Sequence, residues 1–181
     1  MQIEHLVPEY IVLVRDFLSA ERCRERIAWS EAEGYEEARL SDGSRRTDVR
    51  NNDRLIFDDA ALASRWWARV REAVPVLPSA HPIGLNERFR FYRYHPGQQF
   101  RHHRDGVFQR NDSELSQFTL LVYLNADFEG GGTTFGRWSV TPETGMALLF
   151  RHEIEHAGEA VLRGCKYVLR TDVMFRRGKI S

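Results

Sequence analysis

Two histidines and one aspartate have the types and the spacing that could support metal chemistry. His103 and Asp105 lie two residues apart, and His156 follows 51 residues after Asp105. Two imidazoles and one carboxylate can hold a divalent iron on one face and leave the opposite face open. Open coordination positions allow chemistry, so this spacing indicates an enzyme rather than a structural metal site.

The elements around these three residues must bring them together. Side chains alternate along a strand, so His103 and Asp105, at the end of a strand, can point to the same face. His156 follows the β-like run 147–150, and the small residues directly after it leave room for close approach. A His-x-Asp pair on its own is more often a chance pair of surface side chains. The surrounding sequence must therefore decide whether these residues form a metal site.

The first half of the chain predicts two helices after a β-rich segment at 10–14. Ser19 is a candidate N-cap for a helix over 20–33, and Gly34 is a natural stop. A second helix is expected over about 59–73. Its broad apolar face is formed by Leu62, Trp66, Trp67 and Val70.

From about Glu87 the apolar period changes to two, which is typical of strands. Short strands are expected at 89–94, 118–125, 133–140, 146–150, 159–162 and 167–175. Many short strands without helices between them favour a double-sheet barrel of the jelly-roll kind. The polar segment 105–117 is expected to be a surface loop.

The predicted fold class is therefore mainly β with flanking helices (α+β). No linker is evident, so we expect a single domain over 1–181. Within it, a support region of helices and strands over 1–86 packs on a jelly-roll (double-stranded β-helix) core over 87–177.

Composition narrows the class of protein. The 181 residues include 26 basic and 26 acidic side chains, so the formal net charge is zero and gives no support for a nucleic-acid groove. The N-terminus lacks the features of a signal peptide, and the apolar runs are far below the roughly 20 residues of a membrane span. Two lone cysteines, Cys23 and Cys165, favour free thiols in a reducing compartment. We expect a cytoplasmic protein without a membrane or nucleic-acid partner.

A longer series of motifs resembles one known family. The run Tyr94-x-x-Gly97-x-x-Phe100-x-x-His103-x-Asp105 is similar to the prolyl 4-hydroxylase-type iron(II)/2-oxoglutarate dioxygenases. The similarity continues in the family's order through 121–125, 129–135 and 142–150, and it ends with His156 followed by Lys166. It spans roughly 89–175, and the lead-in at 17–19 is similar as well.

The resemblance implies roles for the site residues. His103, Asp105 and His156 would be the catalytic iron ligands. Lys166, ten residues after His156, stands where the family keeps the cation for the far carboxylate of 2-oxoglutarate, a charge-assisted contact.

Four further cofactor-binding candidates follow from the same resemblance. Tyr123 resembles the family tyrosine on that carboxylate, and Tyr94 is the other pocket candidate. Thr119 and Arg170 have inward-facing positions. The segment 106–117 is expected to lie over the mouth as a lid. Entrance candidates are Arg101, Arg104, Arg137 and Trp138.

The implied reaction is hydroxylation of an unactivated C–H bond with release of succinate and CO2. It would use Fe(II), 2-oxoglutarate and O2, with ascorbate as an expected reductant. Asp105 argues against a halogenase, in which a small residue there frees a site for halide. The segment 167–175 departs from the tryptophan-rich strand of animal and plant prolyl hydroxylases, so the substrate stays open among a peptidyl proline, a free amino acid and another small molecule.

Two other functions compete with this one. A non-catalytic jelly-roll binding module is disfavoured, because such a module would be expected to lose its ligands. The run His152-Glu-Ile-Glu-His156 matches the HExxH motif of zinc hydrolases, but that motif needs a helix and neither flank predicts one. We therefore expect His152 to be a polar loop or strand-end residue, and His102 to lie on the rim or the outer face.

Overall fold

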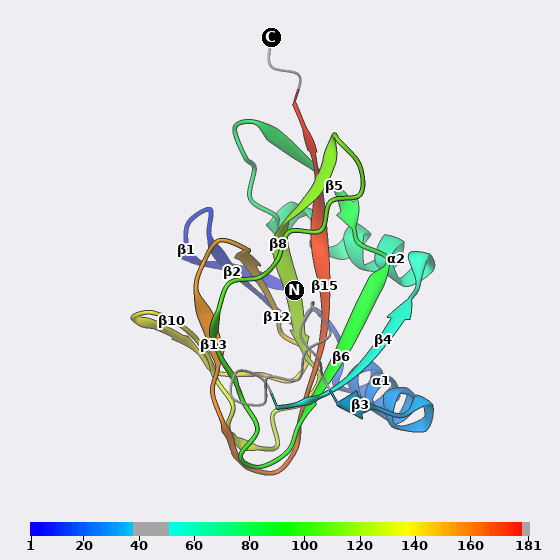
Figure 1. The fold of residues 1–181 in the computed structure, drawn as a ribbon, viewed down its shortest axis with the longest axis vertical. Helices are drawn as coiled ribbons and strands as arrows, with labels where there is room; N and C mark the ends of the chain where they lie inside the picture. Colours follow the sequence, from blue (N-terminus) through cyan, green and yellow to red (C-terminus); the bar gives the residue numbers. More distant parts are fainter. Residues whose placement is uncertain (38–50, 179–181) are drawn as a thin grey trace.

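Two facing sheets with helices on one side make up the molecule (Figure 1). The computed structural model describes residues 1–37 and 51–178. The large sheet has the strand order β1-β2-β12-β8-β15-β6-β4-β3, and β5 pairs with β15 beside this path. Its strands are β1 (Gln2–Val7), β2 (Ile11–Arg15), β3 (Glu36–Glu37), β4 (Asp53–Asp58), β5 (Ala80–Leu85), β6 (Arg88–Tyr94), β8 (Glu114–Tyr123), β12 (Ala147–Arg151) and β15 (Lys166–Arg177).

A smaller sheet faces it with the order β11-β10-β13-β7. Its strands are β7 (Phe100–His103), β10 (Thr133–Phe135), β11 (Trp138–Val140) and β13 (His156–Gly158). β9 (Glu129–Gly130) and β14 (Val161–Arg163) form a separate pair. The pairings are antiparallel, as the jelly-roll prediction requires, and the predicted fold class is confirmed.

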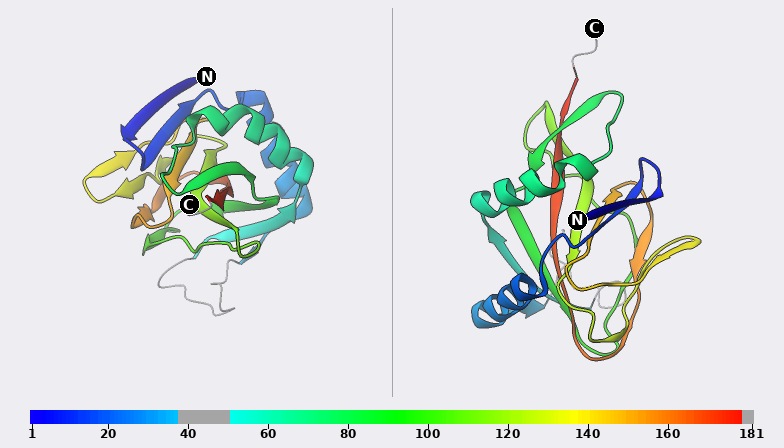
Figure 2. Two further views of the ribbon diagram at one scale, coloured as in Figure 1. Left: turned by 90° about the horizontal axis from the view of Figure 1, so that it is seen from above. Right: turned by 180° about the vertical axis from the view of Figure 1, so that it is seen from behind.

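The large sheet is buried on both faces. In β2, Ile11 and Leu13 join the core between the two sheets, whereas Val12 and Val14 join the core beneath the helices. This alternation follows from the period of two along a strand. Seen from behind, the helices lie on one side and the small sheet lies on the other (Figure 2).

The two helices lie where the sequence predicts them. α1 (Ala20–Glu33) begins after Ser19, whose side chain accepts a hydrogen bond from the Arg22 N–H at 3.2 Å. α2 (Ala60–Val70) begins after Asp59, whose Oδ1 accepts from the Leu62 N–H at 2.8 Å. The second helix is shorter than predicted, because 71–73 form a turn of 3-10 helix.

One loop prediction and two strand predictions were wrong in their bounds. The segment 105–117 is not all loop, because β8 begins at Glu114 and its first residues pair with the far end of β15. The predicted strand 133–140 is a hairpin of β10 and β11, turned at Gly136, which has a φ of 57°. The strand expected at 159–162 is β14 at 161–163.

The N-terminal strands are part of the same large sheet as the jelly-roll core. β2 pairs with β12, and β4 pairs with β6, so elements from 1–86 extend the sheet at both ends. Cys23 and Cys165 are both free, as predicted. In the described part of the chain, no helix is both long and apolar enough to cross a membrane.

Candidate metal centre

The predicted metal triad lies in a cavity between the two sheets. β13 pairs with β7 so that His156 stands directly opposite His103, with ring centroids 4.2 Å apart. Asp105 follows two residues after β7, and its backbone N–H donates to the His152 carbonyl at 3.2 Å. One ligand atom from each of the three residues lies within 4.8 Å of the others.

Both imidazoles present Nε2 toward the carboxylate. His103 Nε2 is 3.7 Å from Asp105 Oδ1, and His156 Nε2 is 3.8 Å from Asp105 Oδ2. His103 Nδ1 lies 2.7 Å from the Arg101 carbonyl, and His156 Nδ1 lies 3.0 Å from the Ile154 carbonyl. Because a carbonyl only accepts, each Nδ1 carries the proton, and each Nε2 lone pair is free for a metal.

The charges of the triad suit a cation. Burial alone raises the pKa of Asp105, but the Arg170 guanidinium, the two histidines and Thr119 together hold it well below its usual range. Burial lowers the pKa of His156 to about 4, so its imidazole is neutral near pH 7. One ionised carboxylate and neutral imidazole nitrogen are ligands that a divalent iron accepts.

Lys166 lies in the same cavity and is buried, with 4% of its surface exposed. Its ammonium donates to the Gly131 carbonyl at 2.6 Å, and it has no carboxylate partner within the described residues. Burial lowers the pKa of Lys166 to about 8. A buried cation of this kind is a site for an anionic group.

The two predicted tyrosines flank that lysine. The Lys166 Nζ lies 5.3 Å from the ring centroid of Tyr94 and 5.5 Å from that of Tyr123. The Tyr123 hydroxyl hydrogen-bonds the Thr133 hydroxyl at 2.7 Å, and burial raises its pKa, so the phenol is protonated. Thr133 was not predicted, and its place is set by the pairing of β10 with β13.

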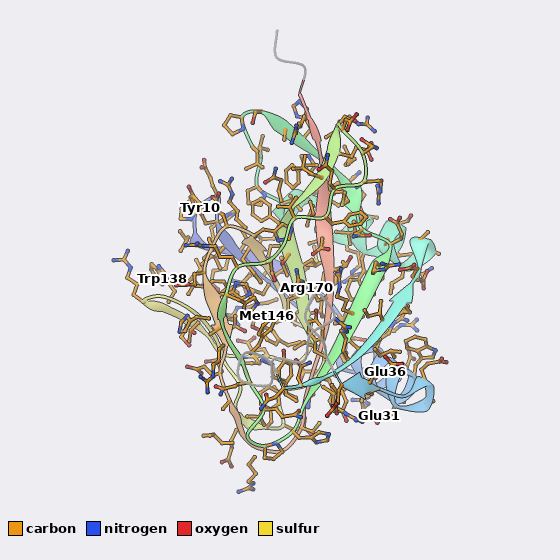
Figure 3. The ribbon with its side chains drawn as sticks, viewed as in Figure 1. Tyr10, Glu31, Glu36, Trp138, Met146 and Arg170 are labelled. Atoms are coloured by element: carbon orange, nitrogen blue, oxygen red, sulfur yellow. The ribbon has the colours of Figure 1, made fainter. Side chains whose placement is uncertain are left out.

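Thr119 and Arg170 line the same cavity but contact the metal triad. The Thr119 hydroxyl donates to Asp105 Oδ2 at 2.5 Å, and Arg170 Nη1 lies 2.9 Å from Asp105 Oδ1. Lys166 and Arg170 share a face of β15 because they are four residues apart. Arg170 lies near the centre of the molecule, over β15 (Figure 3). The structure thus places these two candidates beside Asp105.

His152 is a site residue whose burial the sequence did not show. It follows β12 at a turn, as predicted, yet only 3% of its surface is exposed. Its Nδ1 lies 3.2 Å from the Thr119 hydroxyl, and its Nε2 lies 2.9 Å from the Ser116 hydroxyl. Residues 152–156 contain a turn and the start of a strand rather than a helix, so the zinc-hydrolase motif is excluded.

The predicted entrance residues do not gather at one place. Arg101 and His102 line an open groove that contains none of the three triad residues. The Arg137 guanidinium stacks over Trp138 at 5.2 Å, at the tip of the β10–β11 hairpin (Figure 3). Arg110 of the predicted lid pairs with two carboxylates, those of Glu87 and Glu114.

Comparisons with known proteins point to one family and one fold. Residues 89–171 match the family model described as the 2OG-Fe(II) oxygenase superfamily. No curated protein matches the chain.

Three solved structures share the fold. A viral collagen prolyl hydroxylase from Paramecium Bursaria Chlorella virus-1, described as a 2OG complex, has a TM-score of 0.66 at 21% identity, covering 92% of this chain and 96% of that one. A Pseudomonas putida prolyl-4-hydroxylase has a TM-score of 0.67 at 20% identity, covering 92% of each chain. A Trichoplax adhaerens prolyl hydroxylase, in complex with a hypoxia inducible factor oxygen degradation domain peptide fragment, has a TM-score of 0.73 at 14% identity, covering 93% and 85%.

The family match spans the strands that carry the triad and Lys166, and the fold is that of prolyl hydroxylases over nearly the whole chain. The family implies Fe(II), 2-oxoglutarate and O2. Over residues 89–171 the chain therefore matches the 2OG-Fe(II) oxygenase superfamily, and this match supports a 2-oxoglutarate-dependent dioxygenase.

Proposed function

We propose that the chain hydroxylates an unactivated C–H bond, with conversion of 2-oxoglutarate and O2 into succinate and CO2. The observation that carries the proposal is the buried Lys166 ammonium, without a carboxylate partner in the described residues, in the same cavity as the triad. A cation and a metal site in one cavity can bind a dicarboxylate at both of its ends.

We propose His103, Asp105 and His156 as the ligands of Fe(II). Their Nε2 and carboxylate atoms converge, their protonation states suit a cation, and three ligands leave coordination positions open. When bound, the iron supplies the activation of O2. The residues around the three ligands fix the charge state and the orientation of each ligand.

Lys166 is the proposed partner of the far carboxylate of 2-oxoglutarate. Its ammonium would form a charge-assisted hydrogen bond in a site with little access to water. The Tyr123 ring centroid lies 5.5 Å from the ammonium, and the protonated Tyr123 hydroxyl is the proposed second donor to the same carboxylate. The low exposure of both side chains keeps water away from the co-substrate.

A peptidyl substrate, with proline as the first residue to test, is the finer proposal. It is supported by the likeness of the fold to three prolyl hydroxylases, one of which is in complex with a peptide fragment. A free amino acid is the second candidate. Use of ascorbate, a cytoplasmic location, absence of nucleic-acid and membrane partners, and the division into 1–86 and 87–177 stay predictions.

The test is anaerobic addition of Fe(II) and 2-oxoglutarate to the protein. A weak visible charge-transfer band is expected, and succinate should appear when air is admitted. His156→Ala should abolish iron binding, whereas Lys166→Ala should mainly weaken 2-oxoglutarate binding. Absence of both band and succinate would refute the proposal, and equal loss of iron affinity in the two variants would refute the assigned roles.

A further inference from the structure

A chain of buried hydrogen bonds leads away from the metal carboxylate and has a single direction. The Thr119 hydroxyl donates to Asp105 Oδ2 at 2.5 Å, as a hydroxyl does to the carboxylate oxygen of a metal ligand. Having used its proton there, the Thr119 oxygen must accept from His152 Nδ1. His152 Nδ1–H is therefore the donor, and the proton of the neutral imidazole lies on Nδ1.

The remaining hydrogen bonds of this series follow from the same reasoning. A neutral imidazole protonated on Nδ1 has an acceptor at Nε2, so the Ser116 hydroxyl donates to it over 2.9 Å. The Ser116 oxygen in turn accepts from the Phe108 backbone N–H at 2.8 Å. Each of the three side chains therefore makes one donation and one acceptance, and each is satisfied.

Burial makes this chain costly to break. Thr119 and Ser116 are fully buried, and 3% of His152 is exposed, so water cannot replace a missing partner. The last hydrogen bond of the series comes from the Phe108 backbone, within the segment between the metal motif and β8.

We propose that His152 is a positioning residue for the metal: through the Thr119 hydroxyl it holds Asp105 in the orientation that the metal needs. This inference rests on the proposed iron site. Groups that orient a metal ligand typically change metal affinity by about 10- to 100-fold when they are removed. His152 does not touch the metal or the co-substrate position itself.

The first test is the tautomer in the metal-free protein. Nitrogen-15 NMR of the imidazole should show His152 protonated on Nδ1 alone, with slow exchange of that proton. A ring protonated on Nε2 would overturn the proposal, because Thr119 could not then donate to Asp105 and accept from His152 together. This measurement needs no variant and no metal.

The second test is Co(II) binding, measured by calorimetry on metal-free protein. Thr119→Val and His152→Leu should each weaken Co(II) binding about tenfold, and the double variant should lose no more than one of them. His152→Asn should recover most of the affinity, since its side-chain amide can donate where Nδ1–H does. Additive losses in the double variant would contradict a shared path.

Thr171→Val is the matched control. Thr171 is fully buried on β15, and its hydroxyl donates to the Asn86 carbonyl at 2.6 Å, outside this chain of hydrogen bonds. It should lower stability and leave Co(II) affinity unchanged. Wild-type Co(II) affinity in the Thr119 and His152 variants would overturn the positioning role alone, whereas failure of the wild type to bind metal would overturn the proposed iron site.

Discussion

At the scale of single residues, the neighbours of each site group set its charge. The sequence identified His103, Asp105, His156 and Lys166 because their spacing resembles a family pattern. It could not show that each triad imidazole donates to the backbone carbonyl of the residue two positions earlier, since that contact depends on the local strand geometry. Charge at this site is therefore a property of the folded structure.

Lys166 makes 2-oxoglutarate binding dependent on pH. Before 2-oxoglutarate binds, burial lowers the pKa of Lys166 to about 8, so the ammonium is charged below that pH and neutral above it. The KM for 2-oxoglutarate should therefore rise above about pH 8, by up to tenfold per unit, with a smaller change below it. Steady-state kinetics from pH 6.5 to 9.5 would measure this.

Lys166→Arg is the control for that profile. A guanidinium stays charged throughout this range, so the variant should show a flat KM above pH 8 whatever its absolute affinity. A rise of equal slope in both proteins would assign the pH dependence to another group.

Arg170 should contribute strongly to stability. Its guanidinium pairs with Asp105 and Asp172, and the two carboxylate side chains are 3% and 2% exposed. Arg170→Met would leave buried negative charge without its partner and should cost about 3 kcal/mol of unfolding free energy in metal-free protein. Urea denaturation would measure it.

Arg88 offers the comparison on the surface. It pairs with Asp58 at 2.9 Å, with both side chains about half exposed. Arg88→Met should cost no more than about 1 kcal/mol, because water solvates both charges. Similar losses in the two variants would show that Arg170 is not held as an ion pair.

His152 illustrates what residue patterns leave out. Its position after a strand was predicted, but burial of a histidine in a turn depends on what packs over it, and that is non-local. Thr119 and Arg170 were expected to face inward as cofactor-binding candidates. The resemblance did not reveal that their partner is Asp105.

At the scale of elements, local signals were reliable and long-range pairings were not. The bounds of α1 agree with the prediction because Ser19 and Gly34 mark its ends by short-range hydrogen bonds. The start of β8 was missed because Glu114 and Leu115 belong to the strand through pairing with β15, about 60 residues later. β1 and β5 lack a strong alternation and were not predicted.

One tight turn between β11 and β12 fixes how the N-terminal segment meets the barrel. Gly145 has a φ of 81°, its carbonyl accepts from the Leu18 N–H at 2.9 Å, and an added Cβ would collide with the Leu18 carbonyl. Gly145→Ala should therefore lower the unfolding free energy by more than the ~1–2 kcal/mol of left-handed strain alone. Thermal unfolding by circular dichroism is the measurement.

Gly136→Ala separates strain from collision. Gly136 also has a positive φ, 57°, but no atom of the described residues lies within 4 Å of an added Cβ. Gly136→Ala should therefore lower the unfolding free energy by the cost of left-handed strain alone. If the two variants lose equal stability, contact with Leu18 does not matter to the fold.

At the scale of the whole molecule, the large sheet unites both halves of the chain. The pattern of short strands after two helices was enough to predict a jelly roll with helices on it. They did not show that β2 and β4 enter the same sheet as the core strands, since pairing between distant strands leaves no local trace in sequence. The helices, β2 and the segment between β2 and α1 supply much of one core, through residues such as Val12, Phe17, Leu62 and Trp66.

The region 87–177 should therefore not fold by itself. Its isolation would leave β12 and β6 as unpaired edges and would expose the face that Phe17 and Trp66 now cover. A fragment of residues 87–181 should aggregate or lack a cooperative thermal transition and near-ultraviolet circular dichroism. Removal of residues 1–9 is the matched control, because the strand it takes away is β1, a partly exposed edge strand whose one partner among the described strands is β2. That shorter deletion should fold and bind Co(II). A cooperative transition in the 87–181 fragment would show instead that the jelly roll folds without residues 1–86.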